Sequence, residues 1–245
     1  MSTEKIYNVT LSQMEKHFDN TGLLEHLDIG SGSGDLISLL KTKFNINSKC
    51  CDYTDELMQI PDQKVEIIDL NINKKLPYDD NSFDIITATE VIEHLEDFRA
   101  ILREIYRILK PNGMIVLSTP NTINLNSRLR NLWFGFAELM GPLPIQDRKI
   151  ESCAGHINPV SPFYIIHSLY EMNFRKIDFT FDKYQRSGIG KALFFWLPIK
   201  IFGMKIWYQE VRRYKTIDES NRHIVKSLNS LPVLLGRTIV VYAIK

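Results

Sequence analysis

Three glycines at alternate positions are the feature of this sequence that most plainly suggests chemistry. Gly30, Gly32 and Gly34 lie in the run from Asp28 to Asp35, between a strand-like apolar segment and a helix-like one. A glycine-rich turn at such a junction lets a ligand touch the backbone. A diphosphate would meet two carboxylates here, whereas cationic groups would be attracted by them. The turn therefore favours a positively charged ligand over a dinucleotide.

Acidic residues also close the next two predicted strands. Asp52 comes eighteen residues after Gly34, where a carboxylate can accept both hydroxyls of a ribose. Asp69 and Leu70 follow the third strand, where an acid can accept from the adenine amino group and an apolar side chain can cover the ring. Taken singly, each acid also fits a turn residue that bonds its own backbone. Together with the glycines, they predict an adenosine pocket whose cationic ligand is S-adenosylmethionine.

The elements that must position these residues follow from the apolar periodicity, which alternates between strand and helix through the first half. Repeated βα units predict an α/β fold with a doubly wound, mostly parallel sheet. Two late strands are expected to pair antiparallel at the sheet edge, at 176–182 and 238–244. The other predicted strands are 25–29, 49–52, 65–68, 83–88 and 114–118, and the helices are 9–18, 35–44, 55–60, 90–109 and 162–173.

The second half of the sequence is less regular. Residues 119–160 form a long segment without clear periodicity, which is typical of a substrate cover. Residues 183–237 are predicted to be an arm inserted between the last two strands. We expect one domain over 1–245, with its cofactor-binding core at 22–121.

Composition and charge limit the possible partners. The chain has 245 residues, of which 44% are apolar and 24% charged, so it is too rich in core formers to be disordered. With a net charge of +1, the protein has no overall positive field that would attract nucleic acid. The charges are unevenly placed, however, because residues 1–182 carry a net charge of −8 and residues 183–215 a net charge of +7. Three cysteines in no disulfide or zinc pattern, and an N-terminus without the apolar segment of a signal peptide, predict a cytoplasmic protein.

The run from Leu24 to Asn121 resembles class I S-adenosylmethionine-dependent methyltransferases of the type 11/23 kind. "HLDIGSGSGD" resembles their first motif, "CCDYTDELM" their ribose acid and "IIDLN" their adenine acid, while "LPYDDNSFDIITATEVIEHL" and "LREIYRILKPNGMIVLSTPN" resemble their fourth and fifth strands. The resemblance implies a Rossmann-like fold and methyl transfer that leaves S-adenosylhomocysteine. The expected cofactor contacts are Asp28, Gly30, Ser31, Gly32, Gly34, Asp52, Tyr53, Asp69, Leu70, Thr89 and Glu90.

The later segments "GHINPVSPFYIIHSLYEMNF" and "LPVLLGRTIVVYAIK" are similar to methyltransferases of surface-polysaccharide and glycolipid pathways. This similarity implies an oxygen of a sugar or lipid-linked glycan as the acceptor. A hydroxyl acceptor benefits from a general base, and His156 is the candidate because it follows the predicted cover and titrates near neutrality. The alternative, a histidine that bonds loop backbone, fits the sequence equally well.

Glu90, Glu93 and His94 would share one face of the predicted helix 90–109. "EVIEHL" resembles the metal-binding helix of small-RNA 2′-O-methyltransferases, which with His156 would give a metal-assisted RNA ribose methyltransferase. The same string occurs in methyltransferases without metal, where the first Glu lines the cofactor pocket, and acids at a helix start are favoured in any case. We expect no metal. A non-catalytic cofactor-binding module is the remaining alternative.

Residues 191–208 are apolar and aromatic, but Pro198, Lys200 and Lys205 interrupt them, which makes a poor transmembrane helix. Trp196, Trp207 and the flanking basic residues suit peripheral contact with the inner face of the membrane. Packing of this segment on its own domain, or a dimer contact, fits the sequence as well. No nucleic-acid partner is expected because no RNA-binding module accompanies the segment. The sequence leaves the oligomeric state open.

Overall fold

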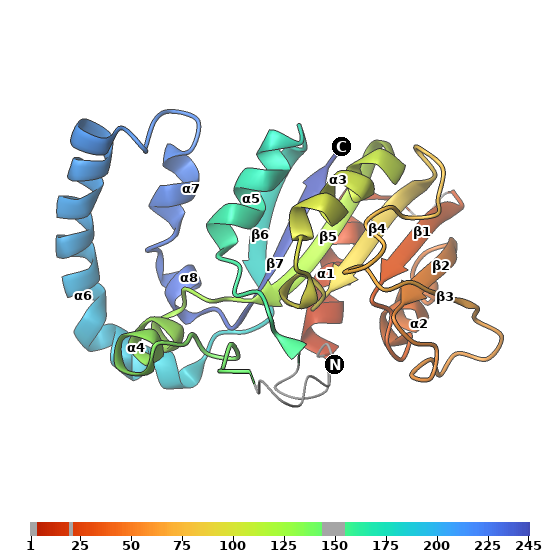
Figure 1. Cartoon of the computed structure of the whole chain (residues 1–245), viewed down its shortest axis with the longest axis horizontal. Helices are drawn as coiled ribbons and strands as arrows, with labels where there is room; N and C mark the ends of the chain where they lie inside the picture. The colour runs from red at the N-terminus through yellow and green to blue at the C-terminus, as the bar shows by residue number, and fades with distance from the viewer. Residues whose placement is uncertain (1–3, 20–21, 144–154) are drawn as a thin grey trace. The chain divides into compact units, whose positions relative to one another are not determined.

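A computed structural model describes residues 4–19, 22–143 and 155–245 (Figure 1). The chain divides into two compact units. Unit 1 consists of Met1–Thr119, Ser168–Thr180 and Val240–Lys245, and unit 2 of Pro120–His167 and Phe181–Ile239. The single domain expected over 1–245 stays a prediction.

The central element is a seven-stranded sheet in the order β3-β2-β1-β4-β5-β7-β6. Neighbours among β1 to β5 pair in parallel, whereas β7 runs antiparallel between β5 and the outermost strand β6. This confirms the predicted α/β fold and its antiparallel pair. The strands are β1 Leu24–Ile29, β2 Ile46–Asp52, β3 Val65–Ile67, β4 Phe83–Thr89, β5 Leu109–Pro120, β6 Arg175–Phe181 and β7 Thr238–Ile244.

Helices cover both faces of the sheet (Figure 1). Successive side chains of a strand point to opposite faces, so each buried strand supplies both layers. Helices α1 (Glu4–His17) and α2 (Asp35–Lys41) share a core cluster with Ile85, Met114 and Val116. Helix α3 (Phe98–Ile108) lies on the other face and buries an apolar stripe against it, and α5 spans Pro162–Glu171.

Two predicted helices are wrong in whole or in part. Residues 55–60 form turns, because the Thr54 hydroxyl accepts from the Glu56 amide (3.2 Å) and Pro61 follows directly. The helix predicted over 90–109 reduces to a 3₁₀ turn at Ile92–His94 and to α3. The chain is extended at Leu95, and the side chain of Asp97 caps α3 by accepting from the Ala100 amide at 3.0 Å.

Helices are the main regular elements in the described part of unit 2. It holds α4 (Leu125–Phe134), α6 (Arg186–Gln209), α7 (Arg222–Ser227) and α8 (Leu231–Leu235). A small core of Leu125, Leu129, Ala192 and Leu234 joins α4, α6 and α8.

The predicted segments of this half take definite structure. Most of the arm 183–237 is helical, and its longest element, α6, continues through Pro198 instead of stopping there. Proline frees one backbone carbonyl four residues earlier, and the helix is exposed at that point, so water can take the lost bond. The predicted cover 119–160 contains α4, while its residues 144–154 lie outside the described residues.

Candidate functional site

The predicted cofactor residues of unit 1 come together at one edge of the sheet. Parallel strands present their carboxyl ends at the same edge, and the order 3-2-1-4 places β1 beside both β2 and β4. The strand order reverses between β1 and β4, which is where open α/β sheets bind ligands. Gly30 follows β1, Asp52 ends β2, Asp69 follows β3 and Thr89 ends β4.

The glycine turn after β1 has a backbone that other residues rarely adopt. Gly30, Gly32 and Gly34 have φ values of 72°, 50° and 81°. A Cβ on Gly30 would come within 2.5 Å of Val91 Cγ2, so the turn packs tightly there. A Cβ on Gly32 would meet no atom within 4 Å. The backbone is therefore open to a ligand at Gly32, between two positions that are closed by packing.

Asp52 fixes the middle of this turn. Its Oδ2 accepts from the Gly32 amide at 2.8 Å, its Oδ1 accepts from the Tyr53 amide at 2.7 Å, and the residue is 8% exposed. Each carboxylate oxygen has a second lone pair with which it can accept from another donor. Asp52 thus accepts hydrogen bonds from nearby backbone, which is the alternative role that the sequence allowed for this residue. Its remaining lone pairs can still accept from two ribose hydroxyls.

The loop after β3 is tied to the loop after β4. Asp69 and Leu70 are half-buried, and Asp69 Oδ1 accepts from the Asn71 amide at 2.9 Å. Asn71 Nδ2 donates to the His94 carbonyl at 2.9 Å, and its Oδ1 accepts from the Glu96 amide at 2.8 Å. Asn71 is not among the predicted site residues, although it belongs to the "IIDLN" motif. It holds the two loops together.

Glu90 follows β4 in a strained conformation. Its φ is 56°, which costs a non-glycine residue about 1 to 3 kcal/mol and is often found at functional sites. Ser118 fixes it from β5, because the Ser118 hydroxyl accepts from the Glu90 amide (3.0 Å) and lies 3.1 Å from Oε1. The neighbouring Thr89 is buried. The side chain of Glu90 is therefore held at the edge that carries the glycine turn.

Asp28 lies beneath the turn, inside the sheet, and is only 2% exposed. Thr87 Oγ1 donates to its Oδ1 at 2.6 Å. Burial raises the pKa of Asp28 to about 7, helped by the charge of Asp52, while the Thr87 bond opposes the rise. At neutral pH this carboxyl is thus partly protonated, so it contributes less negative charge to the turn than the sequence suggests.

A buried chain of hydrogen bonds continues from Asp28 through three strands. His26 Nε2 lies 2.8 Å from Thr87 Oγ1, and its Nδ1 lies 3.0 Å from Ser48 Oγ. Since Thr87 donates to Asp28, it accepts from His26 Nε2–H, and Nδ1 accepts from Ser48. Burial lowers the pKa of His26 to about 3, so the ring is neutral. No sequence pattern predicts this series of hydrogen bonds, because its residues come together only when the strands pair.

The three residues of the metal hypothesis in unit 1 do not share a helix face. Glu93 is fully buried and its Oε2 accepts from Thr119 Oγ1 at 2.9 Å, while His94 is half-buried. Burial, reinforced by the charge of Glu90, raises the pKa of Glu93 well above its usual range. The expected i, i+3, i+4 arrangement is therefore wrong, because the chain here forms a 3₁₀ turn.

A pocket of about 280 Å³ in unit 1 lies next to the glycine turn. Asp35 and Leu39 of α2 form one wall. The other wall comes from the first turns of α1, which begins five residues earlier than predicted and supplies Glu4, Tyr7 and Asn8. No motif marks these three residues, so sequence reasoning missed them.

His156 belongs to unit 2 and is half-buried. Its Nδ1–H donates to the Leu139 carbonyl at 2.6 Å, which places the proton on Nδ1 and the lone pair of the neutral ring on Nε2. Burial lowers the pKa of His156, which the bond to Leu139 opposes. The ring is therefore neutral at pH 7, in the tautomer that a base acting through Nε2 requires.

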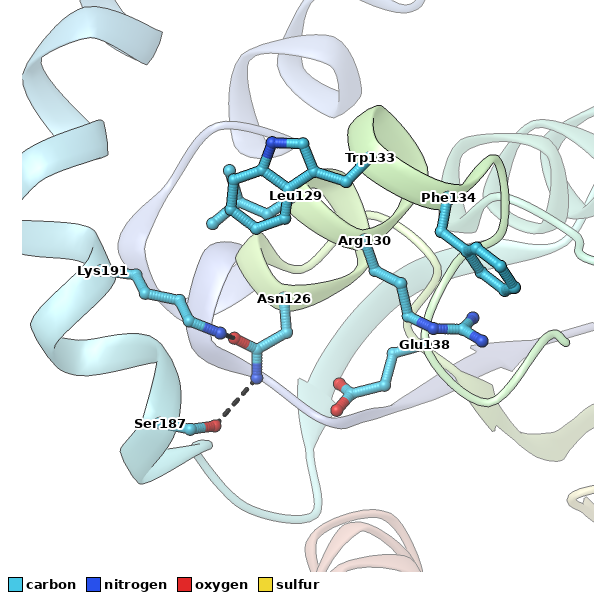
Figure 2. A pocket seen from close by; sticks show the side chains of 8 residues that line it. All are labelled: Asn126, Leu129, Arg130, Trp133, Phe134, Glu138, Ser187 and Lys191. Carbon is cyan, nitrogen blue, oxygen red and sulfur yellow. Dashed lines mark hydrogen bonds between the residues drawn. The ribbon is translucent and has the colours of Figure 1, made fainter.

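Unit 2 also contains a pocket of about 350 Å³ between α4 and the start of α6 (Figure 2). Lys191 Nζ donates to Asn126 Oδ1 at 2.7 Å, and Asn126 Nδ2 donates to Ser187 at 2.9 Å. Trp133 forms an aromatic wall above these polar groups. The complete lining is Asn126, Leu129, Arg130, Trp133, Phe134, Glu138, Ser187 and Lys191.

Comparison with known proteins identifies the first part of the chain. The family model described as "Methyltransferase domain" matches residues 27–117, which contain the glycine turn, Asp52, Asp69 and Glu90. Residues 27–117 therefore match a class I methyltransferase domain. Enzymes of this class use S-adenosylmethionine and leave S-adenosylhomocysteine, and the methyltransferase domain falls inside the predicted core 22–121.

Curated relatives match less than half of the chain. The chain is 35% identical over 105 residues to the ubiquinone/menaquinone biosynthesis C-methyltransferase UbiE of Rickettsia akari, covering 37% of this chain and 42% of that one. It is 30% identical over 133 residues to the demethylmenaquinone methyltransferase of Lactobacillus johnsonii, covering 47% and 54%. The chain thus spans about half the length of these curated relatives.

Solved structures share the fold over nearly the whole chain. A SAM-dependent methyltransferase from Archaeoglobus fulgidus has a TM-score of 0.59 at 19% identity and covers 98% of this chain and 94% of its own. Phosphoethanolamine N-methyltransferase 2 of Haemonchus contortus has a TM-score of 0.55 at 15% identity and covers 97% and 52%. At these identities the likeness establishes the fold alone.

Proposed function

We propose that the protein transfers a methyl group from S-adenosylmethionine to an acceptor. The observation that carries this proposal is the edge formed by β1 to β4, where the open glycine turn, Asp52 and Asp69 come together in a matched methyltransferase domain. This edge is complementary to an adenosine with a cationic sulfur, because it offers bare backbone and carboxylates. Formation of S-adenosylhomocysteine by the purified protein tests it, and also distinguishes an enzyme from a non-catalytic binding module.

Each part of the cofactor has a proposed partner among the residues of unit 1. Asp52 accepts from the ribose hydroxyls with its remaining lone pairs, and Asp69 with Leu70 binds the adenine. Gly32 leaves backbone open to the ligand, and Glu90 is held at the same edge by Ser118. The cofactor supplies an electrophilic methyl group, and the rate of its transfer depends on holding the acceptor in line with it. The remaining proposed contacts, Ser31, Tyr53 and Thr89, border these groups in sequence.

Asp52→Ala should weaken binding of S-adenosylhomocysteine by about 1 to 3 kcal/mol, because charge-assisted hydrogen bonds to the ribose are lost. Titration calorimetry of both proteins measures the change. Asp79→Ala, which removes an exposed turn carboxylate of the same unit, is the matched control and should bind normally. Unchanged affinity in Asp52→Ala would remove its assigned role, and tighter binding of NADH than of S-adenosylhomocysteine would overturn the proposal.

For the acceptor, we favour an oxygen of a sugar or lipid-linked glycan. The pocket of unit 2 supports this, since it combines the wall of Trp133 with the polar groups of Asn126, Ser187, Glu138 and Lys191, a lining suited to a hydroxyl-rich ring. We also propose that residues 191–208 make peripheral contact with the membrane, where a lipid-linked acceptor is found. The relatives' names refer to methylation of carbon in quinone biosynthesis. Transfer of a ¹³C-labelled methyl group, followed by the carbon shift of the product, distinguishes O-, N- and C-methylation.

The metal-assisted alternative, methylation of RNA ribose, predicts complete dependence on a divalent ion. We expect activity to survive EDTA, because the carboxyl of Glu93 is buried and already accepts from Thr119. Turnover is measured before and after chelation, with the same acceptor extract and with a short RNA. Loss of activity with EDTA and its return with magnesium or manganese would favour the alternative.

The cytoplasmic location stays a prediction. Cys50 and Cys51 are free and buried, as in a reducing compartment.

A further inference from the structure

Helix α6 of unit 2 exposes many large apolar side chains. Helix α6 is 24 residues long, yet only Gly188 and Ala192 of it are buried. Leu193, for example, is 82% exposed. Exposed apolar side chains on a monomer are usually scattered singly, whereas those of α6 are numerous. Eleven large apolar side chains of α6 are exposed: Ile189, Leu193, Phe194, Phe195, Trp196, Leu197, Ile201, Phe202, Met204, Ile206 and Tyr208.

Helix α4 extends this surface. Its last turn exposes Leu132, Trp133 and Phe134, and Trp133 is 72% exposed. Helices α4 and α6 share the small core around Leu129 and Ala192, so they are neighbours within unit 2 (Figure 1). We define the α4–α6 surface as 132–134 together with the exposed apolar residues of α6, which lie on these two neighbouring helices.

Basic residues accompany the α4–α6 surface. Residues 183–215 contain eight Lys or Arg and one acid, Glu210, a net charge of +7. Lys200 and Lys205 lie within α6, and the Arg212 guanidinium stacks on the Tyr208 ring at 4.1 Å from its centroid. Apolar rings with basic side chains around them are complementary to the interface of a bilayer that contains anionic lipids.

The helix does not suit a membrane span. None of the helices in the described ranges has the length and hydropathy that crossing a bilayer demands. Lys200 and Lys205 would place charges in the C-terminal half of such a span, whereas in a helix lying in the interface they can extend to the headgroups. The geometry therefore favours α6 lying in the plane of the membrane surface.

We propose that unit 2 docks on an anionic bilayer surface through the α4–α6 surface. Contact between two copies of this surface would bring the basic residues of both copies together, and RNA, whose bases can stack on the aromatic rings, would leave the exposed aliphatic side chains of Leu193 and Leu197 without an apolar partner. This proposal assigns a specific surface to the peripheral membrane contact of the proposed function, and it rests on that part of the proposed function. Its test needs neither cofactor nor acceptor, so failure of methyl transfer would leave the docking result intact.

Sedimentation of the 245-residue chain with vesicles tests the docking. We expect binding to phosphatidylcholine vesicles that contain phosphatidylglycerol, weaker binding to phosphatidylcholine alone, and loss of binding with added salt. All three tryptophans, Trp133, Trp196 and Trp207, lie on α4 or α6, so intrinsic tryptophan fluorescence reports on these two helices. Their emission should shift to the blue on binding.

Two double substitutions separate the apolar contribution from the electrostatic one. Leu193→Ser with Phe194→Ser, and separately Lys200→Glu with Lys205→Glu, should each weaken vesicle binding at least about tenfold. Ile72→Ser is the matched control, because this unit 1 side chain is 76% exposed and lies outside the surface. Melting curves check that each variant folds.

Equal binding to neutral and anionic vesicles would overturn the electrostatic part of the proposal. Absence of vesicle binding would overturn it entirely. If light scattering then shows a dimer that Leu193→Ser with Phe194→Ser dissociates, the surface is a contact between copies of the chain. Binding that survives in the apolar double variant would also contradict the proposal.

Discussion

Replacing His156 by alanine should slow methyl transfer about 10²- to 10⁴-fold while the affinity for S-adenosylhomocysteine stays nearly unchanged. The expected loss corresponds to about 3 to 5 kcal/mol of transition-state stabilisation. The reason is that the Leu139 carbonyl holds the proton on Nδ1, so Nε2 can accept the proton of a hydroxyl acceptor. The proposed cofactor contacts all come from unit 1, whereas His156 belongs to unit 2. Steady-state turnover and calorimetry on one preparation measure both quantities.

His156→Asn sharpens this test. Asparagine retains a donor near the position of Nδ1, so it can keep the bond to Leu139, but it has no group at the position of Nε2. A base predicts that asparagine and alanine are equally slow. A merely structural histidine predicts that asparagine restores turnover and that alanine lowers the melting temperature. A fall of less than about tenfold in a stably folded alanine variant would exclude the base.

Burial lowers the pKa of His156, so its base form persists below the usual range of histidine. The acidic limb of kcat/KM should therefore lie below pH 6.5 in the natural protein and be absent from both variants. This profile is a second readout of the same group.

Asp28→Asn should stabilise the protein relative to the natural chain, and increasingly so as the pH rises from about 4 to about 7. The pKa of Asp28 rises from 3.8 to about 7 on folding, mainly through burial. Between these values the folded protein holds a proton that the unfolded chain has lost, so stability present at low pH is lost as the pH rises. A difference of one pKa unit corresponds to about 1.36 kcal/mol, so Asp28→Asn can raise the free energy of unfolding by at most about 4 kcal/mol. Urea unfolding at several pH values measures it.

The amide introduced by Asp28→Asn would keep an oxygen for the Thr87 hydroxyl, so the buried chain to His26 can persist. Asp79→Asn is the matched control, because it makes the same replacement at an exposed carboxyl of unit 1. A constant difference between Asp28→Asn and the natural protein across this range would show that Asp28 ionises normally.

Local patterns in the sequence predicted the strand ends well. The glycines after β1, the acid that ends β2 and the acid after β3 are recognised from neighbouring residues. Parallel strands must bring their carboxyl ends to one edge. The helix predicted over 90–109 shows where this approach fails. Its apolar spacing continues across Glu90 to Leu95, but pairing of β4 with β5 and the bonds to Ser118 hold that stretch in another conformation.

The sequence by itself determined the class of fold and the position of the glycine turn, because both depend on periodicity and on glycines that are close together in the chain. Only the tertiary structure decided the state of Asp28, since a carboxyl is neutralised by the burial and neighbours that strand pairing supplies. The same holds for the tautomer of His156, which depends on a carbonyl seventeen residues away. Exposure of α6 likewise follows from how little of unit 2 packs against it, which no residue type in the helix encodes.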